Sequence, residues 1–513
     1  MKALFHLSLN FFRENSVPIL LFFLILVHGS LLGLSDDEAY YWVLAQKPML
    51  SYAFHPPAVA WLIGSFQFLL GGMMNHPHPG LVRFPAALSI AIILGIFLKW
   101  LKQEGFVQSK RYRASLVLLS FCGFFPLSWM MVPDIPLFLG WSLLFKSTWD
   151  ICFRSKKFSN PSYIDLLGLG LGAILSILSK YSAILAVFSS LICLWIWAGK
   201  KRRCLGVLTL VMAVIFALLP IVIWNSQHQW ASILYQIRDR HGGMHLSWVR
   251  YFRFWLIEAL CAGPIVLIYT LSLSFRAAVF WKRFQEPIFQ FIAIWVWPAA
   301  AVFCLQPLFF DFKPHWALVV WWPIFLLLAW ISQGNAWQWI RVQVGYGLTV
   351  GVIILLSCHF PLISWVISEI STVNPRIHYD PKWDVTHDLY GWAQLPQKLR
   401  ELMRDEKFPV IGSRYQTASQ AAFVLGNEFE VTYLPRDQKE WDEWKDVVVS
   451  EGIGPDWPVL KKTIFFVSDI RYDAGPSFKQ AVCKKIDRLE VYRFSLLAKW
   501  IDIWRCDPTL RSF

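Results

Sequence analysis

Residues 17–42 read VPILLFFLILVHGSLLGLSDDEAYYW, a long apolar run that ends in three consecutive carboxylates. About 20 apolar residues are enough to cross a bilayer as a helix, so the run predicts a membrane span. Asp36, Asp37 and Glu38 then fall where this span meets headgroups and water. Adjacent acids at a membrane face repel one another and resist burial, so they must serve some other charge or a reaction.

The rest of the chain repeats the apolar pattern. It has 513 residues, of which 56% are hydrophobic, with 29 Trp and 41 Phe. Run length predicts a polytopic α-helical membrane protein with about eleven spans. We expect the spans to be centred near residues 25, 91, 122, 142, 171, 189, 214, 264, 296, 323 and 354.

The net charge of +14 comes from short basic clusters between the apolar runs. Most loop Lys and Arg lie in residues 99–113, 154–158, 199–203 and 276–284, which fall on alternate sides of the predicted spans. Basic loops stay in the cytoplasm, so these clusters and the N-terminus are predicted to be cytoplasmic, and the first apolar run to be a retained span. The charge therefore indicates no nucleic-acid partner.

The opposite loops, residues 35–82, 225–250 and 307–315, are then predicted to lie outside. Within the first of them, PPAVAWLIGSFQFLLGG (56–72) is apolar but slightly short and precedes the turn-rich NHPHPG. We expect it to form a helix at the membrane interface, because a crossing here would turn every later basic cluster outward.

The tail, residues 367–513, is charged and is predicted to be a small extracytoplasmic α/β domain following the membrane domain, residues 1–366. Its strand-like runs are FPVIGS (408–413), EFEVTYL (428–434) and TIFFVSD (463–469), with the helix-like RYQTASQAAFVLG (414–426) between the first two. Cys483 and Cys506 flank the strand-like LEVYRFSLL (489–497) and are disulfide candidates in an oxidising compartment. Two unpaired thiols are the alternative.

The acid triplet has two interpretations. Ser35 followed by Glu38 matches a capping box, with acids in the first helical turn where the helix dipole favours them. Alternatively, one carboxylate at the mouth of a cavity removes a proton from an acceptor hydroxyl. Spacing alone does not decide between a helix cap and a general base.

Further charged residues are predicted at the outer ends of spans. They are His55 before Pro56-Pro57, Asp134 between two prolines, Lys180 in a short turn, and Lys313 and His315 before the tenth span. Such charges usually face a cavity or snorkel to the interface, and for Lys180 taken alone snorkelling is the favoured interpretation. Outer acids together with outer cations suit a ligand that has both an anionic phosphate and a neutral hydroxyl.

In order, the segments DEAYYW (37–42), HPPAVAWLI (55–63), PDIPLFLGW (133–141), SKYSAIL (179–185), NSQHQWASILYQIRDR (225–240) and KPHWALVVWWP (313–323) carry a family resemblance. The chain resembles the GT-C glycosyltransferases, in the branch of protein O-mannosyltransferases and the lipid A aminoarabinose transferase. The tail's SRYQTASQAAFVLG (413–426) is similar to a stretch in bacterial members of this branch.

The resemblance implies roles for individual residues. Asp37 matches the general base, Glu38 shapes the same site, and Asp36 is an additional acid that leaves open which Asp acts. Asp134 matches the conserved acid of a later Asp-x-Pro segment.

The donor phosphate is expected near Lys313 and His315, with Lys180 and His55 close by, although Tyr is more usual than His315-Trp316 in that segment. Arg414 and Tyr415 are candidates for contact with the acceptor or between the tail and the membrane domain.

The predicted function is inverting transfer of a monosaccharide from a polyprenyl-phosphate carrier to an envelope acceptor, a glycolipid or a protein, outside a bacterial inner membrane. Phosphate is a good leaving group that fixed cations stabilise, so no cofactor is required. No ligand cluster indicates a metal, although a divalent cation stays open. The alternative is a transporter or flippase, which predicts internal repeats that the sequence does not show.

Overall fold

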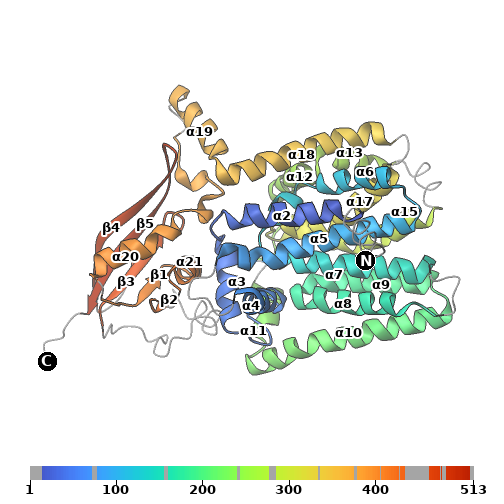
Figure 1. Cartoon of the computed structure of the whole chain (residues 1–513), viewed down its shortest axis with the longest axis horizontal. Coiled ribbons are helices and arrows are strands. Elements are labelled where there is room, and N and C mark those ends of the chain that lie inside the picture. Colours follow the sequence, from blue (N-terminus) through green and yellow to red (C-terminus); the bar gives the residue numbers. More distant parts are fainter. Residues whose placement is uncertain are drawn as a thin grey trace, which may run out of the picture.

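The computed structural model describes residues 14–71, 78–154, 160–239, 243–275, 285–332, 336–374, 378–404, 406–426, 428–433, 462–473, 475–476 and 481–508. Two of the basic segments used for the topology, 155–158 and 276–284, lie outside these ranges. Figure 1 shows a bundle of long, roughly parallel helices with a smaller part, built on a sheet, at one end.

The helices of the bundle are mostly apolar. They are α2 (Ser16–Ser30), α5 (Pro79–Gln103), α6 (Gln108–Leu119), α7 (Asp134–Phe153), α8 (Tyr163–Ser179), α9 (Ile184–Trp197), α10 (Lys200–Gln227), α12 (Trp248–Ala262), α13 (Pro264–Phe275), α15 (Pro287–Phe303), α16 (Gln306–Phe309), α17 (Leu318–Ile331) and α18 (Trp337–His359). Among the described residues, five helical segments are long and apolar enough to cross a membrane: Pro79–Gln103, Lys200–Gln227, Pro287–Phe309, Pro314–Ile331 and Trp337–His359.

The predicted span centres fall inside helices except at two places, where the prediction is wrong. Helix α6 ends at Leu119, and residue 122 lies in the turn that leads to a 3-10 helix, Phe125–Leu127. Its apolar residues, such as Phe121 and Phe124, are buried in the core, which is why they resembled a span. Residue 264 begins α13, because Gly263 (φ +97°) and the following proline end α12.

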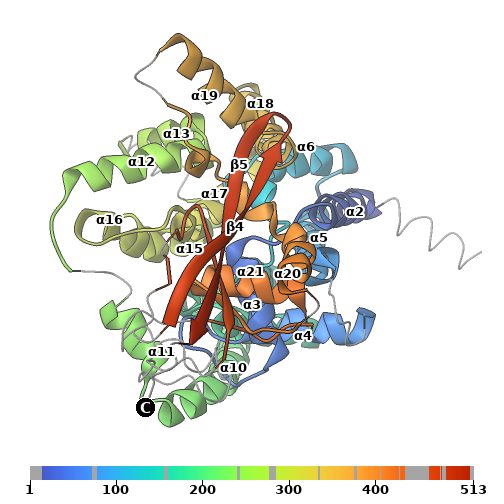
Figure 2. The same cartoon turned by 90° about the vertical axis from the view of Figure 1, so that its left-hand side faces the viewer.

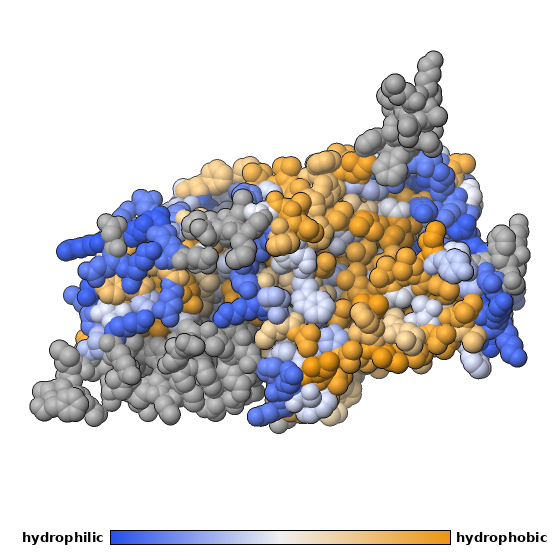
Figure 3. Space-filling view, turned by 60° about the horizontal axis from the view of Figure 1, so that its bottom comes forward, coloured by the Kyte–Doolittle hydropathy of each residue, from blue (hydrophilic) through white to orange (hydrophobic). Residues whose placement is uncertain are grey.

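Apolar surface covers the outside of the bundle. In Figure 3, hydrophobic residues gather over the helical part and hydrophilic residues gather at both ends. Only 28% of the most apolar window of α10 is buried, against 72% for Pro314–Ile331. Helix α10 therefore lies at the rim of the bundle, where lipid would solvate its side chains, and α17 lies in the centre.

Two helices of the first outer loop, α3 (Asp36–Gln46) and α4 (Ala58–Gly71), lie crosswise to the bundle between its long helices and the sheet (Figures 1 and 2). This orientation agrees with the interfacial helix expected for residues 56–72. The α5–α6 and α9–α10 turns, which hold the basic residues 99–113 and 199–203, lie at the far end of the bundle from the sheet (Figure 1).

The sheet has the strand order β2-β1-β3-β5-β4. Its strands are β1 (Val410–Gly412), β2 (Val431–Tyr433), β3 (Ile464–Asp469), β4 (Ala481–Arg493) and β5 (Leu496–Pro508). Strand β1 pairs in parallel with β2 and β3, and β5 is antiparallel to β3 and β4. Helices α20 (Leu395–Met403) and α21 (Tyr415–Leu425) pack on it, and α19 (Leu362–Val373) joins it to the bundle. The three strand-like runs and the intervening helix therefore lie where the sequence predicts them.

Strands β4 and β5 form a hairpin that one interpretation of the sequence missed. The run LEVYRFSLL (489–497) was expected to be one strand, but Phe494 adopts a left-handed backbone (φ 54°) and the chain reverses there. The apolar alternation continues through the turn, so the pattern alone conceals it. The structure bonds Cys483 to Cys506, which face each other across this hairpin and are the disulfide candidates of the sequence.

Candidate active site

The three acids of residues 36–38 form the first turn of α3, and they point to three different environments. Ser35 caps the helix: its hydroxyl accepts a hydrogen bond from the Glu38 amide (3.3 Å), and Glu38 accepts one from the Ser35 amide (3.1 Å). The capping box predicted from the sequence is therefore present. The capping box accounts for an acid at position 38, but it does not account for the acids at positions 36 and 37.

Glu38 is fully buried, and both of its carboxylate oxygens accept hydrogen bonds. Arg83 of α5 donates from Nε to Oε1 (2.8 Å) and from Nη2 to Oε2 (2.6 Å), and the Met131 amide donates to Oε1 (2.9 Å). Arg83 also donates to the carbonyls of Gly29, Leu32 and Gly33 at the end of α2. The pair thus fixes α3 against α2 and α5, so Glu38 positions the site rather than touching a ligand.

Asp36 is also buried, and it faces the tail. The side-chain amide of Gln420 on α21 donates to Asp36 Oδ1 (3.0 Å), to the Leu34 carbonyl (2.9 Å) and to the Asp388 carbonyl (3.4 Å). Burial and the charge of Asp388 raise the pKa of Asp36 to about 8. Asp36 is therefore mostly neutral at pH 7 and binds the tail to the first outer loop.

Asp37 faces an open space. Its side chain is exposed to a cavity of about 1030 Å³ and makes no hydrogen bond or ion pair with any residue that the structure describes. Surrounding protein raises the pKa of Asp37 through burial first and then through the charge of Asp388, whereas Lys313 opposes the rise. An unengaged carboxylate with a raised pKa in a cavity is suited to accept a proton.

Lys313 and His315 reach this large cavity from the other side, where both side chains are exposed next to the 3-10 helix Pro314–Ala317. Lys313 makes no ion pair with a described residue, so its ammonium can meet a ligand phosphate. The large cavity therefore places an acid and a cation in one space, as the sequence predicted for Asp37 and Lys313.

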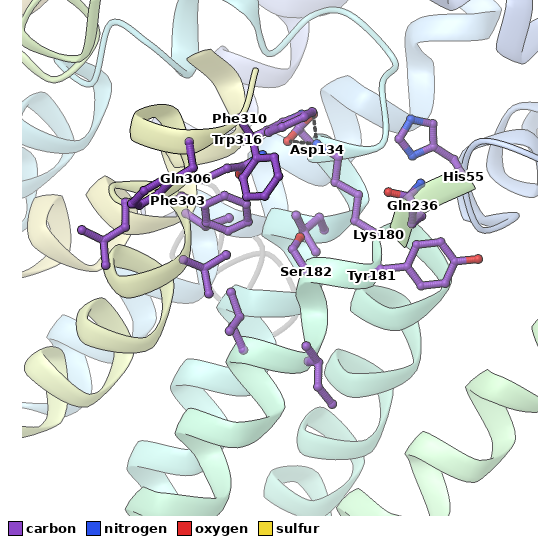
Figure 4. A pocket seen from close by; sticks show the side chains of 17 residues that line it. His55, Asp134, Lys180, Tyr181, Ser182, Gln236, Phe303, Gln306, Phe310 and Trp316 are labelled. Atoms are coloured by element: carbon purple, nitrogen blue, oxygen red, sulfur yellow. Dashed lines mark hydrogen bonds and ion pairs between the residues drawn. The ribbon is translucent and has the colours of Figure 1, made fainter. Parts of the chain in front are cut away.

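A second cavity, of about 560 Å³ and mostly apolar, lies beside the first among α7, α9, α15 and α17. His55, Asp134, Lys180 and Trp316 line both cavities and mark where they meet. In Figure 4, Asp134 and Lys180 lie between the aromatic side chains of this pocket and His55. The apolar cavity therefore adjoins the charged one at these shared residues.

Lys180 does not snorkel, because its ammonium contacts both oxygens of Asp134 (2.8 and 2.9 Å). The two residues are buried and come from the ends of different helices. Pairing neutralises most of the charge of each, which lowers the cost of burying them. Asp134 is therefore engaged with Lys180 and is less suited than Asp37 to act as a base.

The tail closes one side of the large cavity. Helix α21 packs against α3, with the rings of Tyr415 and Tyr40 5.5 Å apart. Gly33 allows the closest approach, since a Cβ there would lie 2.5 Å from the Leu389 carbonyl oxygen. Arg414 and Tyr415, both predicted as contacts, line the large cavity.

Sequence reasoning missed Arg471, Tyr472 and Asp388, which also line the large cavity. Arg471 donates to Asp388 (2.9 Å), whose other neighbour is His387 (3.0 Å). A usable signal existed, because Arg414 follows β1 and Arg471 follows β3. The carboxyl ends of parallel strands meet at one edge of a sheet, which is where α/β proteins place ligands.

A metal has no obvious place in this arrangement. In the described ranges, no group of three or more His, Cys, Asp or Glu side chains could hold a metal ion. The described lining of the large cavity offers acids, cations and apolar side chains.

Fold and cavities together define a polytopic membrane protein with a cavity lined by charged residues between its helix bundle and a small α/β tail. The structure is similar to ArnT from Cupriavidus metallidurans bound to undecaprenyl phosphate, at 13% identity, a TM-score of 0.59, and 96% and 97% of the two chains covered. The apo form of the same protein aligns at 14% identity with a TM-score of 0.59, and the alignment covers 98% of each chain. ArnT is a lipid A aminoarabinose transferase of GT-C type, so the fold is one from the branch that the motifs resemble.

An oligosaccharyltransferase from Archaeoglobus fulgidus, in complex with Zn and sulfate, aligns over 89% of this chain at 12% identity, but with a TM-score of only 0.34. No protein-family model and no curated protein matches the sequence. At these identities the likeness to ArnT shows the fold, and function must be argued from the cavity.

Proposed function

We propose that this protein is an inverting glycosyltransferase that moves a monosaccharide from a polyprenyl-phosphate carrier to a hydroxyl or phosphate of an envelope glycolipid. The observation that carries the proposal is Asp37, an acid without a partner among the described residues, in a cavity that also holds Lys313 and that adjoins an apolar pocket. A lipid-linked sugar phosphate needs this combination: apolar walls for the chain, a cation for the phosphate and a base for the acceptor.

The donor would lie across the junction of the two cavities. Its polyprenyl chain fits the apolar cavity, whose lining includes Leu137, Ile184 and Phe303. Its phosphate would meet Lys313, with His315 and His55 nearby. Lys180, whose ammonium contacts both Asp134 oxygens, also lines both cavities and would lie close to the phosphate. Undecaprenyl phosphate bound to ArnT, on the same fold, supports a carrier of this class.

The reaction would be a single displacement. Asp37 takes the proton of the acceptor hydroxyl, the oxygen attacks the anomeric carbon, and the bond from that carbon to the phosphate oxygen breaks. Lys313 stabilises the charge that develops on the departing phosphate. Attack opposite the leaving group inverts the anomeric centre, and Asp37 loses its proton to water before the next turnover.

The acceptor side of the large cavity favours a lipid over a peptide. The lining of the cavity also includes Ile353, Ile354 and Cys358 of α18, Ile363 of α19 and Val385 of the tail. Ile353, Ile363 and Val385 are exposed. An amphiphile whose acyl chains stay in the bilayer could reach Asp37 along these side chains.

The positive-inside pattern supports the orientation of this site. The basic α5–α6 and α9–α10 turns lie opposite the tail (Figure 1), so a cytoplasmic position for them places Asp37 and the tail outside. We therefore propose a bacterial inner-membrane protein with a cytoplasmic N-terminus and a periplasmic or extracellular tail.

Product analysis tests the function. The purified protein in lipid nanodiscs is incubated with a polyprenyl-phosphate sugar and extracted envelope lipids, and lipid products are analysed by mass spectrometry. A transferase releases free polyprenyl phosphate and adds one sugar to an acceptor. Donor that stays intact but crosses the bilayer of sealed vesicles would instead identify a transporter or flippase and refute the proposal.

A further inference from the structure

The charged side chains of the large cavity sort into partnered and unpartnered groups. Most have a partner: Asp134 pairs with Lys180, Asp388 with Arg471 and Asp311 with Arg250, and Asp36 accepts a hydrogen bond from Gln420. Three make no ion pair with any residue in the described parts of the chain, namely Asp37, Lys313 and Arg414. The proposed reaction uses the first two and leaves Arg414 without a role.

Arg414 is held in a way that a solvated surface arginine is not. It lies between β1 and α21, and its guanidinium stands 5.3 Å from the ring centroid of Tyr472. The side chain lines the large cavity and has no ion-pair partner among the described residues, so its guanidinium can meet an anion that enters the cavity. A planar guanidinium is also the side chain that best matches phosphate or carboxylate.

The position of Arg414 separates it from the donor. Lys180, His55 and Trp316 mark the junction with the apolar cavity, and Arg414 does not line that cavity. It belongs to the tail, which closes the large cavity from outside. An anion at Arg414 would therefore enter with the acceptor rather than with the polyprenyl carrier.

We infer that Arg414, supported by the Tyr472 ring, forms an anion subsite that binds a phosphate or carboxylate group of the acceptor. This inference rests on the proposed function and adds the substrate class: the acceptor is an anionic amphiphile. The group bound here would orient the acceptor so that its nucleophilic oxygen faces Asp37.

Arginine labelling tests the subsite without knowledge of the acceptor. The full-length protein in nanodiscs is treated with phenylglyoxal, with inorganic phosphate or with sodium chloride of equal ionic strength, and labelled peptides are quantified by mass spectrometry. Phosphate is expected to slow labelling of Arg414 several-fold relative to chloride. Arg400, which pairs with Glu428 on the surface of the tail, is the matched control and should not be protected. Equal labelling of Arg414 in both salts overturns the subsite.

The variant Lys313→Ala distinguishes an anion bound at the acceptor subsite from one bound at the donor phosphate site. Protection of Arg414 that persists in this variant supports a subsite distinct from the donor phosphate. Protection that disappears would mean that Lys313 and Arg414 hold one and the same anion, and would overturn the assignment to the acceptor.

Kinetics give a second, independent measurement. With a polyprenyl-phosphate sugar as donor and envelope lipids as acceptor, Arg414→Gln should raise the half-saturating acceptor concentration about tenfold or more, because a charge-assisted contact is lost. The half-saturating donor concentration should not move, and Arg400→Gln should change neither. A change in the donor constant alone would contradict the inference. If the unmodified protein releases no polyprenyl phosphate, the proposed function fails, and labelling still decides whether Arg414 binds anions.

Discussion

The substitution Asp37→Asn separates catalysis from stability more sharply than any other change in the cavity. Asp37 has no hydrogen-bond or ion-pair partner among the described residues, and its side chain is exposed to the cavity. The amide keeps the size of the side chain and removes its basicity. Losing a general base costs about 10²- to 10⁴-fold in turnover, which is a barrier increase of about 2.7–5.4 kcal/mol. The free energy of unfolding should change by only about 0.5 kcal/mol or less.

Glu38→Gln, one residue away, is the matched control, because it should reduce stability where Asp37→Asn should not. Both Glu38 oxygens accept from Arg83, at 2.8 and 2.6 Å, so the new amide group must face at least one donor. Removing one partner of a buried ion pair costs about 3–5 kcal/mol of stability. We expect this variant to unfold at a lower temperature and to lose activity as a consequence.

The assay measures release of polyprenyl phosphate from a lipid-linked sugar and, on the same preparations, thermal unfolding followed by intrinsic fluorescence. The reasoning predicts an inactive but normally stable Asp37→Asn protein and an unstable Glu38→Gln protein. Turnover close to that of the unmodified protein in a folded Asp37→Asn variant would refute Asp37 as the base. Equal loss of turnover in a stable Asp36→Asn variant, with Asp37→Asn active, would move the role to Asp36.

Other expectations follow from the same cavity and from the tail. Lys313→Ala should raise the half-saturating donor concentration about tenfold or more, and a shift in the acceptor constant alone would exchange the two sites. Because burial raises the pKa of Asp37, kcat/KM should rise with pH as Asp37 loses its proton, with a midpoint above the usual Asp value of about 3.9; a flat profile would contradict this. Gln420→Ala should make the tail more susceptible to limited proteolysis, since its hydrogen bonds to Leu34 and Asp36 are lost, whereas an unchanged cleavage rate would deny that contact a role. Thiol labelling without reductant should spare Cys483 and Cys506, because they form a disulfide. Closing this loop should stabilise the folded state by about 3 kcal/mol, and reaction of both thiols would exclude the bridge.

Much of this architecture follows from local sequence. Run lengths placed most of the membrane helices because a helix in lipid must bury its own backbone hydrogen bonds, which leaves a long apolar stretch as its signature. The capping box at Ser35, the crosswise helix near residues 56–72 and the strands β1, β2 and β3 were predictable for the same reason: each depends on residues within a few positions. The predictions failed where buried loops are as apolar as spans, as at residue 122, and where a turn interrupts an alternating pattern, as at Phe494.

What the sequence could not decide is which acid does what. Asp36, Asp37 and Glu38 are adjacent and chemically alike, and their roles are set by partners that lie 384 residues away for Asp36 and 45 residues away for Glu38. Only the tertiary structure brings Gln420 to the first acid and Arg83 to the third, and leaves the second facing a cavity. The carboxylate chemistry was therefore fixed by local sequence, whereas its reactivity depends on burial and neighbouring charge, which exist only once distant segments have packed together.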